Sequence, residues 1–270
     1  MIELTGFDKR FNPGSVNEVH ALRGLDLSVA EGEFVTIIGT NGSGKSTLLN
    51  AVAGEFAPDL GRVSIAGRDV TQAQEHQRAD LVARVFQNPF LGTVPGMSIA
   101  ENLHLASLRG RPLRPRLGLD RARRQEFRAR VQSLEMGLED RLDNAIGSLS
   151  GGQRQALTLL MAVMNTPRVL LLDEHTAALD PKSAAQVLKL TSQFVAERGL
   201  TTLMVTHSMR QALELGNRTI MMHQGRVIED IDQARKRRLT VEDLLDRFAE
   251  LRRAEQLTDD LLEELRRAYV

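Results

Sequence analysis

A glycine-rich run between an apolar stretch and a helical pattern is the first feature of this sequence that could do chemistry. It consists of Gly39, Thr40, Asn41, Gly42, Ser43, Gly44, Lys45, Ser46 and Thr47. Glycines let backbone N–H groups turn toward an anion, and the positive end of a helix that begins near Lys45 adds to the attraction. In this pattern the lysine reaches the β- and γ-phosphates of a nucleoside triphosphate, and the Ser46 hydroxyl coordinates Mg²⁺. The run therefore predicts a phosphate-binding loop.

Two carboxylates follow a second apolar run. Asp173 and Glu174 come directly after Val169 to Leu172. A buried strand delivers such a pair to the carboxyl edge of a sheet, where ligands of open α/β sheets bind. We expect Asp173 to face the Mg²⁺ ion and Glu174 to act as the general base for an attacking water. Paired acids at a strand end are otherwise often a solvated turn, but the four apolar residues before this pair favour a site.

A third motif between these two reveals a family resemblance. It reads Leu149, Ser150, Gly151, Gly152 and Gln153. Taken with the phosphate loop and the acidic strand end, it resembles the ATP-binding cassette subunits of ABC transporters over residues 1–232. The resemblance implies an α/β fold of the P-loop NTPase type. Its parts are a mixed core sheet flanked by helices, an N-terminal antiparallel β subdomain and an inserted α-helical subdomain.

The resemblance also assigns roles to single positions. Gln87 matches the glutamine that senses Mg²⁺ and the attacking water, and His207 matches the histidine near the γ-phosphate. The signature loop at 149–153, through Ser150 and Gly152, is expected to contact the γ-phosphate held by the opposite subunit. Asp180 matches the aspartate at the dimer seam. These assignments imply two cassettes that sandwich two ATP molecules head to tail.

An aromatic residue near the N-terminus is expected to stack on adenine. Phe11 follows Lys9 and Arg10 in a context similar to that site in the family, and Phe7 is the competing candidate. Stacking of a base on an aromatic side chain contributes roughly 1–3 kcal/mol. We favour Phe11, and either ring could instead belong to the core.

One residue departs from the family pattern. His175 follows Glu174, where a proline is common. Replacing proline frees a backbone N–H and loosens φ, and it adds a titratable ring that we expect near the γ-phosphate. A tolerated substitution is the simpler interpretation, since a single local change rarely alters chemistry.

The elements that position these motifs alternate between strand and helix patterns, which favours α/β. Predicted strands cover 33–38, 62–66, 83–86, 169–172, 201–206, 218–222 and 226–229, and predicted helices cover 45–53, 153–164, 183–198 and 209–215. Gln224 and Gly225 form a plausible hairpin turn, and Gly199 and Gly216 stand where helices end with glycine.

Two regions differ from this alternation. Residues 88–146 have helical periodicity and no strand signal, so we expect an inserted helical subdomain, and the resemblance implies that it carries the permease contact. Its apolar residues line a docking groove or form the insertion's own core: Phe90, Leu91, Val94, Met97 and Ile99. Arginines between Arg109 and Arg130 either face lipid headgroups or, the simpler reading, form a solvated face.

The C-terminal extension, 233–270, has helical patterns at 240–251 and 258–268. Thr240 and Thr258 stand before acidic first turns, as N-caps do. Leu244, Leu245, Phe248 and Leu251 follow helical spacing, so one apolar face needs a partner. The extension either packs on the cassette, contacts a second copy or has a regulatory role.

Composition limits the function classes. Thirty-five basic residues balance thirty-five acidic ones, which argues against a nucleic-acid partner, and the absence of cysteine excludes disulfides and Cys-ligated metals. No apolar run approaches the roughly 20 residues that span a bilayer. The resemblance implies an ATPase that uses ATP and Mg²⁺, forms a homodimer and works at the cytoplasmic face of the inner membrane. Because the chain has no span of its own, we expect it to bind separate permease subunits.

The pattern looks more like bacterial importers of small solutes, amino acids among them, that work with an extracytoplasmic solute-binding protein. An export or lipoprotein-release system is the same-fold alternative. A soluble ABC ATPase acting on DNA or ribosomes fits less well, because this chain has one cassette, a short insertion and no cysteine.

Overall fold

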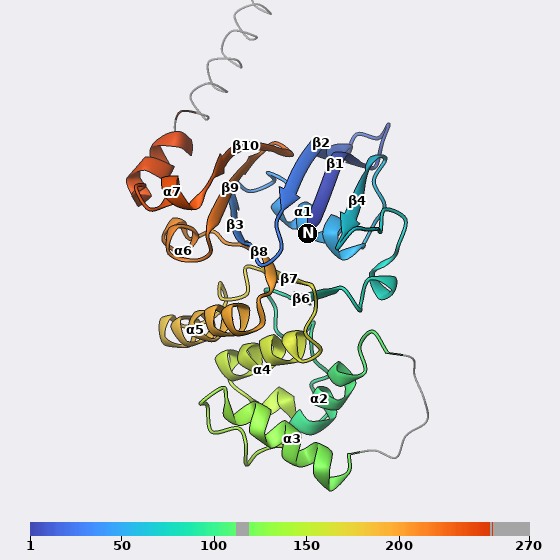
Figure 1. The fold of residues 1–270 in the computed structure, drawn as a ribbon, viewed down its shortest axis with the longest axis vertical. Helices are drawn as coiled ribbons and strands as arrows, with labels where there is room; N and C mark the ends of the chain where they lie inside the picture. The colour runs from blue at the N-terminus through green and yellow to red at the C-terminus, as the bar shows by residue number, and fades with distance from the viewer. Residues whose placement is uncertain (112–118, 249, 251–270) are drawn as a thin grey trace, which may run out of the picture.

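A six-stranded sheet forms the centre of the computed structural model, which describes residues 1–111, 119–248 and 250 (Figure 1). Its strand order is β10-β9-β3-β8-β7-β6. The strands are β3 (Phe34–Gly39), β6 (Val82–Val85), β7 (Val169–Asp173), β8 (Thr201–Val205), β9 (Arg218–His223) and β10 (Arg226–Ile231). Neighbours pair in parallel, except that β9 and β10 form an antiparallel hairpin. The predicted mixed core sheet is confirmed, with strand ends shifted by a residue or two.

The hairpin between β9 and β10 turns at the predicted position. Gln224 and Gly225 both have positive φ, at 45° and 78°. Two consecutive positive φ angles match the right-handed twist of the flanking strands, which is why tight hairpins favour glycine there.

A second, antiparallel sheet covers part of the core sheet. Its order is β2-β1-β4-β5, formed by β1 (Ile2–Phe11), β2 (Val19–Val29), β4 (Leu60–Ile65) and β5 (Arg68–Asp69). Inward-facing residues such as Leu4, Leu27 and Val63 are buried and pack with Val35 and Leu171 of the core sheet. This is the N-terminal antiparallel β subdomain that the resemblance implied.

Helices cover the two faces of the core sheet differently. α1 (Lys45–Ala53) packs in the same apolar cluster as the antiparallel sheet. α4 (Gly151–Val163) and α5 (Pro181–Arg198) pack on the opposite face, against side chains such as Leu170 and Leu172. Because successive strand residues point to opposite faces, the apolar side chains of β7 pack against the helices on both faces of the sheet. The predicted helices are confirmed, and Gly199 ends α5 in the left-handed conformation (φ 58°).

A buried arginine closes the far end of α1. Arg78 follows the 3-10 turn η1 (Glu75–Gln77) and is 1% exposed. Its guanidinium donates to the carbonyl oxygens of Ala51 and Val52 at 2.8 and 2.9 Å, and to those of Val70 and Ala73. The bonds to Ala51 and Val52 satisfy carbonyls that the last turn of α1 leaves free. Burial lowers the pKa of Arg78 to about 10.

The residues described between β6 and α4 form α2 (Ile99–Ser107), α3 (Arg121–Gln132) and the 3-10 turn η2 (Ile146–Ser148), and they contain no strand. Helical structure is thus as the periodicity predicted, while the limits 88–146 of an inserted subdomain stay a prediction. Ile99 is fully buried in the core. Part of the arginine-rich segment is solvated and paired, since Arg124 bonds Asp143 at 2.7 Å and Arg128 pairs with Asp140. Arg114 and Arg116 lie outside the described residues.

The C-terminal part of the described chain packs against the core sheet. After α6 (Met209–Glu214) and the hairpin come α7 (Gln233–Lys236) and a helix over residues 241–248. Thr240 is its predicted N-cap, since its hydroxyl accepts from the Asp243 N–H at 3.2 Å. Leu244 and Phe248 are buried against Ile38, Met221 and Ile231. The expected second helix at 258–268, with Thr258, lies outside the described residues, as does Leu251.

Within 1–111, 119–248 and 250, none of the helices has the length and apolar character that crossing a membrane requires.

Candidate active site

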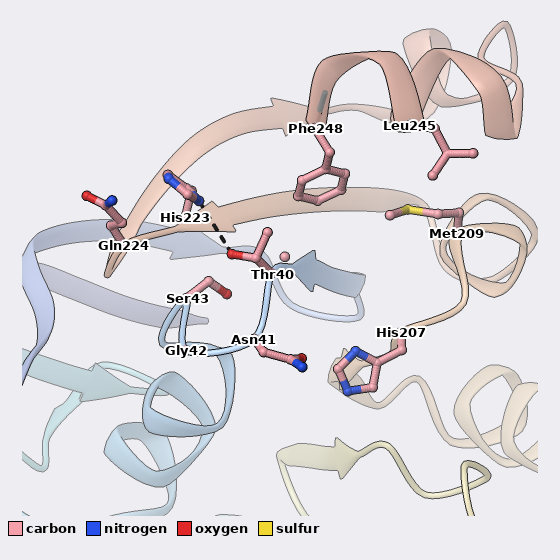
Figure 2. Close-up of a pocket in the computed structure, with 11 residues that line it drawn as sticks. Thr40, Asn41, Gly42, Ser43, His207, Met209, His223, Gln224, Leu245 and Phe248 are labelled. Carbon is pink, nitrogen blue, oxygen red and sulfur yellow. Dashed lines mark hydrogen bonds between the residues drawn. The ribbon is translucent and has the colours of Figure 1, made fainter. Parts of the chain in front are cut away.

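The phosphate loop connects the carboxyl end of β3 to α1, as predicted. Gly44 has φ 98°, and a Cβ atom there would lie 2.6 Å from the Ala21 carbonyl oxygen. At Gly39 a Cβ atom would lie 2.3 Å from the Met222 carbonyl oxygen. The loop therefore requires glycine at both positions to run between β9 and the antiparallel sheet. Its middle residues, Asn41 and Gly42, are exposed at the mouth of a hollow (Figure 2).

Lys45 is folded back onto its own loop. Its Nζ donates to the carbonyl oxygens of Gly39 and Thr40, both at 2.9 Å, and the residue is 6% exposed. Burial lowers the pKa of Lys45, while the nearby carboxylates of Glu174 and Asp173 act in the opposite direction. A buried cation held by two carbonyls has its charge only partly compensated, so an anion in the loop would be a strong partner for it.

Asp173 and Ser46 form the oxygen ligands expected of a magnesium site. Asp173 ends β7 and Ser46 lies in the first turn of α1, with the Ser46 Oγ 3.5 Å from the Asp173 Oδ1. Mg²⁺ in nucleotide sites is held by one or two such protein oxygens together with phosphate oxygens and water. The two residues therefore fit Mg²⁺ bound with a nucleotide. In the described part of the chain, no three His, Cys, Asp or Glu side chains gather into a metal cluster of their own.

Glu174 and His207 meet at the carboxyl ends of adjacent strands. The His207 Nε2 lies 2.5 Å from the Glu174 Oε1, and the Glu174 side chain is 12% exposed against 50% for His207. Glu174 has φ 46°, and its N–H donates to the Val205 carbonyl oxygen at 3.1 Å. A left-handed backbone is uncommon outside glycine and often marks a functional turn. His207 lines the hollow beside the phosphate loop, and the carboxylate of Glu174 is close enough to Lys45 of that loop to act on its pKa.

His175 does not lie where we expected it. The prediction placed its ring near the γ-phosphate, but the side chain is 1% exposed and its Nε2 lies 3.0 Å from the Thr191 Oγ1 of α5. The Thr191 hydroxyl donates to the Val187 carbonyl oxygen, so it accepts from the Nε2–H of the ring. Burial lowers the pKa of His175 to about 4. The His175 ring thus packs in the core against α5 and is not a titrating group at the nucleotide.

The two candidate adenine-stacking rings differ in burial. Phe7 is fully buried in the core, so it cannot stack on a ligand. Phe11 is half-buried at the end of β1, with its ring edge-on to Phe56 at 5.3 Å and the Lys9 Nζ 5.7 Å from its centre. Phe11 is therefore the ring available to a base, and its stacking role stays a prediction. Gln87 is exposed just past the end of β6, beside the strand that ends in Asp173.

The signature residues lie at a helix start away from the phosphate loop. Ser150 is the N-cap of α4 and forms a capping box with Gln153. A Cβ atom at Gly152 would lie 2.5 Å from the Ser183 Oγ, so this glycine allows α4 and α5 to approach closely, while Gly151 is exposed. Asp180 caps α5 by accepting from the Ser183 N–H at 3.0 Å, and hydrogen bonds from the side chain and then the backbone of Ser183 lower the pKa of Asp180. Because α4 and α1 cover opposite faces of the sheet, the fold does not bring Ser150 to the loop of its own chain.

A hollow of about 650 Å³ lies beside the phosphate loop. Besides residues 39–43 and His207, it is lined by residues that the sequence reasoning did not assign to the site: Met209, His223, Gln224, Leu245 and Phe248. Figure 2 shows Leu245 and Phe248 reaching down from the C-terminal helix, and the Thr40 Oγ1 lies 3.4 Å from the His223 Nδ1. In the sequence, the helical spacing of apolar residues in the tail indicated that Leu245 and Phe248 need a contact, but not where. The tail thus forms one wall of the hollow at the loop.

The fold and this arrangement define an ATP-binding cassette, and comparison with known proteins agrees. The family model described as ABC transporter matches residues 22–177. This chain belongs to that family and is the ATP-binding, ATP-hydrolysing subunit of an ABC transporter.

Among curated relatives, the chain is 42% identical over 250 residues to the Tyrosine transport ATP-binding protein of Clostridioides difficile, covering 92% of this chain and 98% of that one. It is 36% identical to the Methionine import ATP-binding protein MetN of Cupriavidus metallidurans, covering 85% of this chain and 64% of that one. It is 34% identical to the Macrolide export ATP-binding/permease protein MacB of Nitrosomonas europaea, covering 85% of this chain and 34% of that one.

A solved structure shares the fold. The dimeric post-hydrolysis state of the ATP-binding cassette MJ0796, bound to ADP and phosphate, superposes with a TM-score of 0.73 at 29% identity. The match covers 86% of this chain and 99% of that one.

Proposed function

We propose that two copies of this chain enclose two ATP molecules head to tail and, by closing and reopening, drive solute movement through a separate permease. The observation that carries the proposal is the contact of Glu174 with His207 beside the phosphate loop. A carboxylate oriented by a histidine at this edge is placed to accept a proton from water as it attacks the terminal phosphate. Such a base has no use in a module that only binds nucleotide.

Within one chain, Lys45 would bind the β- and γ-phosphates after releasing the Gly39 and Thr40 carbonyls. Ser46 and Asp173, with Gln87 from the neighbouring strand end, would hold Mg²⁺. When bound, that ion supplies positive charge that stabilises the negative charge developing on the transferred phosphoryl group. Phe11 would stack on the adenine ring.

The second half of the shell is proposed to come from the partner copy. Ser150 and the glycines after it lie across the sheet from the loop of their own chain, so a second chain is needed to bring them to the γ-phosphate. The N-terminus of α4 presents N–H groups and a positive dipole end that suit a phosphate. The dimeric state of the similar cassette MJ0796 supports this arrangement.

The proposed permease contact is the exposed apolar surface before α2. Phe90, Leu91, Val94 and Met97 are 47%, 69%, 43% and 38% exposed. Leu91 and Val94 line a hollow of about 390 Å³ with residues of α2 and α4. Exposed apolar side chains gathered at a hollow are typical of a protein contact. Ile99, which we had grouped with them, belongs to the core.

For the transported solute we propose an amino acid, moved inward, with an extracytoplasmic binding protein delivering it and the cassette on the cytoplasmic face of the inner membrane. The relatives named for tyrosine transport and methionine import support this class of solute. The relative named for macrolide export supports the opposite direction as the second candidate. Uptake of labelled tyrosine or methionine into vesicles that hold ATP and the chain with its permease separates the two, since an exporter in that orientation gives no uptake.

Glu174→Gln tests the core of the proposal. We expect ATP binding to be retained, hydrolysis to fall by about 10²–10⁴-fold, and a stable ATP-bound dimer to appear in light scattering. Adding Ser150→Arg should abolish that dimer while each chain still binds ATP. Glu214→Gln, in an exposed pair with Arg210, is the matched control. Normal turnover by Glu174→Gln would remove this residue from the role of base, and a monomer under all conditions would refute the shared site.

A further inference from the structure

Arg84 lies against the magnesium site, although no motif includes it. Its Nη2 is 2.7 Å from the Asp173 Oδ2, and the two side chains are 12% and 15% exposed. The other carboxylate oxygen, Oδ1, faces the Ser46 hydroxyl. Asp173 therefore offers one oxygen to the proposed Mg²⁺ position and has the other occupied by a guanidinium.

The fold holds Arg84 in this place. β6 pairs in parallel with β7, and Arg84 is in register with Leu171, two residues before Asp173. Side chains two apart on a strand share a face, so Leu171 and Asp173 point the same way as Arg84, toward α1. The guanidinium also stacks on the Phe86 ring at 4.7 Å and lies 3.4 Å from the Glu55 carboxylate. An arginine in an otherwise apolar strand is thus surrounded by specific contacts.

The contacts do not use the whole guanidinium. Its Nε is a buried atom that has no hydrogen-bond partner in the part of the chain that the structure describes. Glu55, its second anion, is 52% exposed, so that pair is weakened by solvent. The short bond to Asp173 is consequently the main interaction of the Arg84 charge.

We infer that Arg84 is the counter-ion of Asp173 in the nucleotide-free chain and that its charge lowers the affinity of the empty site for divalent cations. A cation bound to the Asp173 carboxylate is repelled by the positive charge of Arg84. Lys45, which interacts electrostatically with Asp173, adds to this repulsion. Mg²⁺ then binds well only with the phosphates of ATP, whose negative charge outweighs both. The inference rests on the proposed role of Asp173 at the magnesium site.

The positive charge of Arg84 has the opposite effect on nucleotide binding, because it favours the binding of metal-free ATP. Without Arg84, the uncompensated carboxylate of Asp173 would repel the phosphates of metal-free ATP. Removing the Arg84 charge should therefore strengthen the binding of the metal and weaken the binding of metal-free ATP. Loss of local structure would instead weaken both, so the two signs together separate a counter-ion from a merely structural residue.

The test uses the full chain with Arg84→Met, which keeps much of the side chain's length, and Arg84→Lys, which keeps the charge. Mn²⁺ binding without nucleotide is measured by electron paramagnetic resonance, and ATP binding in EDTA is measured by calorimetry. For Arg84→Met we expect roughly 10-fold tighter Mn²⁺ binding, because a positive charge that repels the ion is removed from beside its ligand, and weaker ATP binding in EDTA. Arg84→Lys should stay close to the wild type. Arg210→Met, in an exposed pair, is the control for loss of a surface charge.

Unchanged or weaker Mn²⁺ binding by Arg84→Met, with normal thermal unfolding, would overturn the inference and make Arg84 a group that orients Asp173. If Arg84→Met fails to fold, Arg84→Lys decides. Mn²⁺ binding as weak as in the wild type supports the inference, and clearly tighter Mn²⁺ binding refutes it, because that variant keeps the positive charge. Adding Asp173→Asn must remove the gained Mn²⁺ affinity, and its persistence would mean that the ion binds elsewhere. Failure of the proposed function is separate, because it would appear as absent ATP hydrolysis in the wild type.

Discussion

Lowering the pH should destabilise this protein through one buried residue, His175. Its ring donates from Nε2 to Thr191, and its Nδ1 is buried without a hydrogen-bond partner among the described residues. Protonation would place a charge on that Nδ1 with no acceptor, which explains why burial lowers the pKa of His175 to about 4 from an ordinary value of 6.5. The unfolded chain, in contrast, takes up this proton near its ordinary pKa.

The sign and size follow from this difference. Since the pKa of His175 is lowered in the folded state, the unfolded state binds more protons between pH 6.5 and 4. The contribution of neutral His175 to the free energy of unfolding is therefore complete above pH 6.5 and is lost as the pH falls toward 4. With these two pKa values, the free energy of unfolding should drop by about 2 kcal/mol from this residue between pH 7 and pH 5.

The assay is urea unfolding of the wild type and of His175→Gln at both pH values. Glutamine can also donate to Thr191 but does not titrate, so the pH-dependent loss should be smaller in the variant by about 2 kcal/mol, whatever the other histidines contribute. Parallel behaviour of the two proteins would refute the reasoning, because it would mean that His175 keeps an ordinary pKa in the fold.

Three further substitutions test other parts of the structure. Lys45→Ala should lower the affinity for ATP in calorimetry by about 100-fold, because the phosphates lose a charged hydrogen-bond donor, and unchanged affinity would contradict the loop assignment. Phe248→Ala should lower the free energy of unfolding by about 3 kcal/mol, since the ring is 5% exposed in a core cluster, whereas Leu245→Ala, at 51% exposure, should cost less than about 1 kcal/mol. Arg78→Met should lower the free energy of unfolding in urea by at least about 3 kcal/mol, because it leaves carbonyl oxygens at the end of α1 without donors. A loss of stability as small as that of the exposed Arg68→Met would contradict this.

The parts of the site that follow from local rules could be predicted from the sequence. The phosphate loop and α1 depend on glycines and a helix start within nine consecutive residues, and the strand before Asp173 is apolar on both faces. Arg84 could not be predicted, because its contact with Asp173 exists only when β6 and β7 are neighbours in the sheet. Sequence order separates these strands by more than eighty residues, and periodicity carries no information on which strands pair.

The expected position of the His175 ring was wrong for a different reason, while the simpler interpretation, a tolerated substitution, agrees with its place in the core. Proximity in sequence to Glu174 suggested proximity to the phosphate, but consecutive side chains at a strand end point to different sides. The left-handed backbone at Glu174 aims its carboxylate at His207 while His175 enters the core against α5. The tail shows a related limit, since helical spacing predicted that Leu244 and Phe248 need a partner but not that the partner is the cassette's own sheet.

Each charged group of the nucleotide site is held by another group of the same chain. Lys45 is bound to loop carbonyls, Glu174 to His207, and Asp173 to Arg84. Binding of ATP must replace the contacts of Lys45 with the loop carbonyls, and part of the shell around the terminal phosphate is proposed to come from Ser150 of a second copy. A ligand shifts a conformational equilibrium only through its difference in affinity for the two states. If one chain supplies only half of the contacts to the γ-phosphate, the closed dimer binds ATP more tightly than the separate chains do. ATP binding therefore favours the dimer, and loss of the γ-phosphate lets the two chains separate.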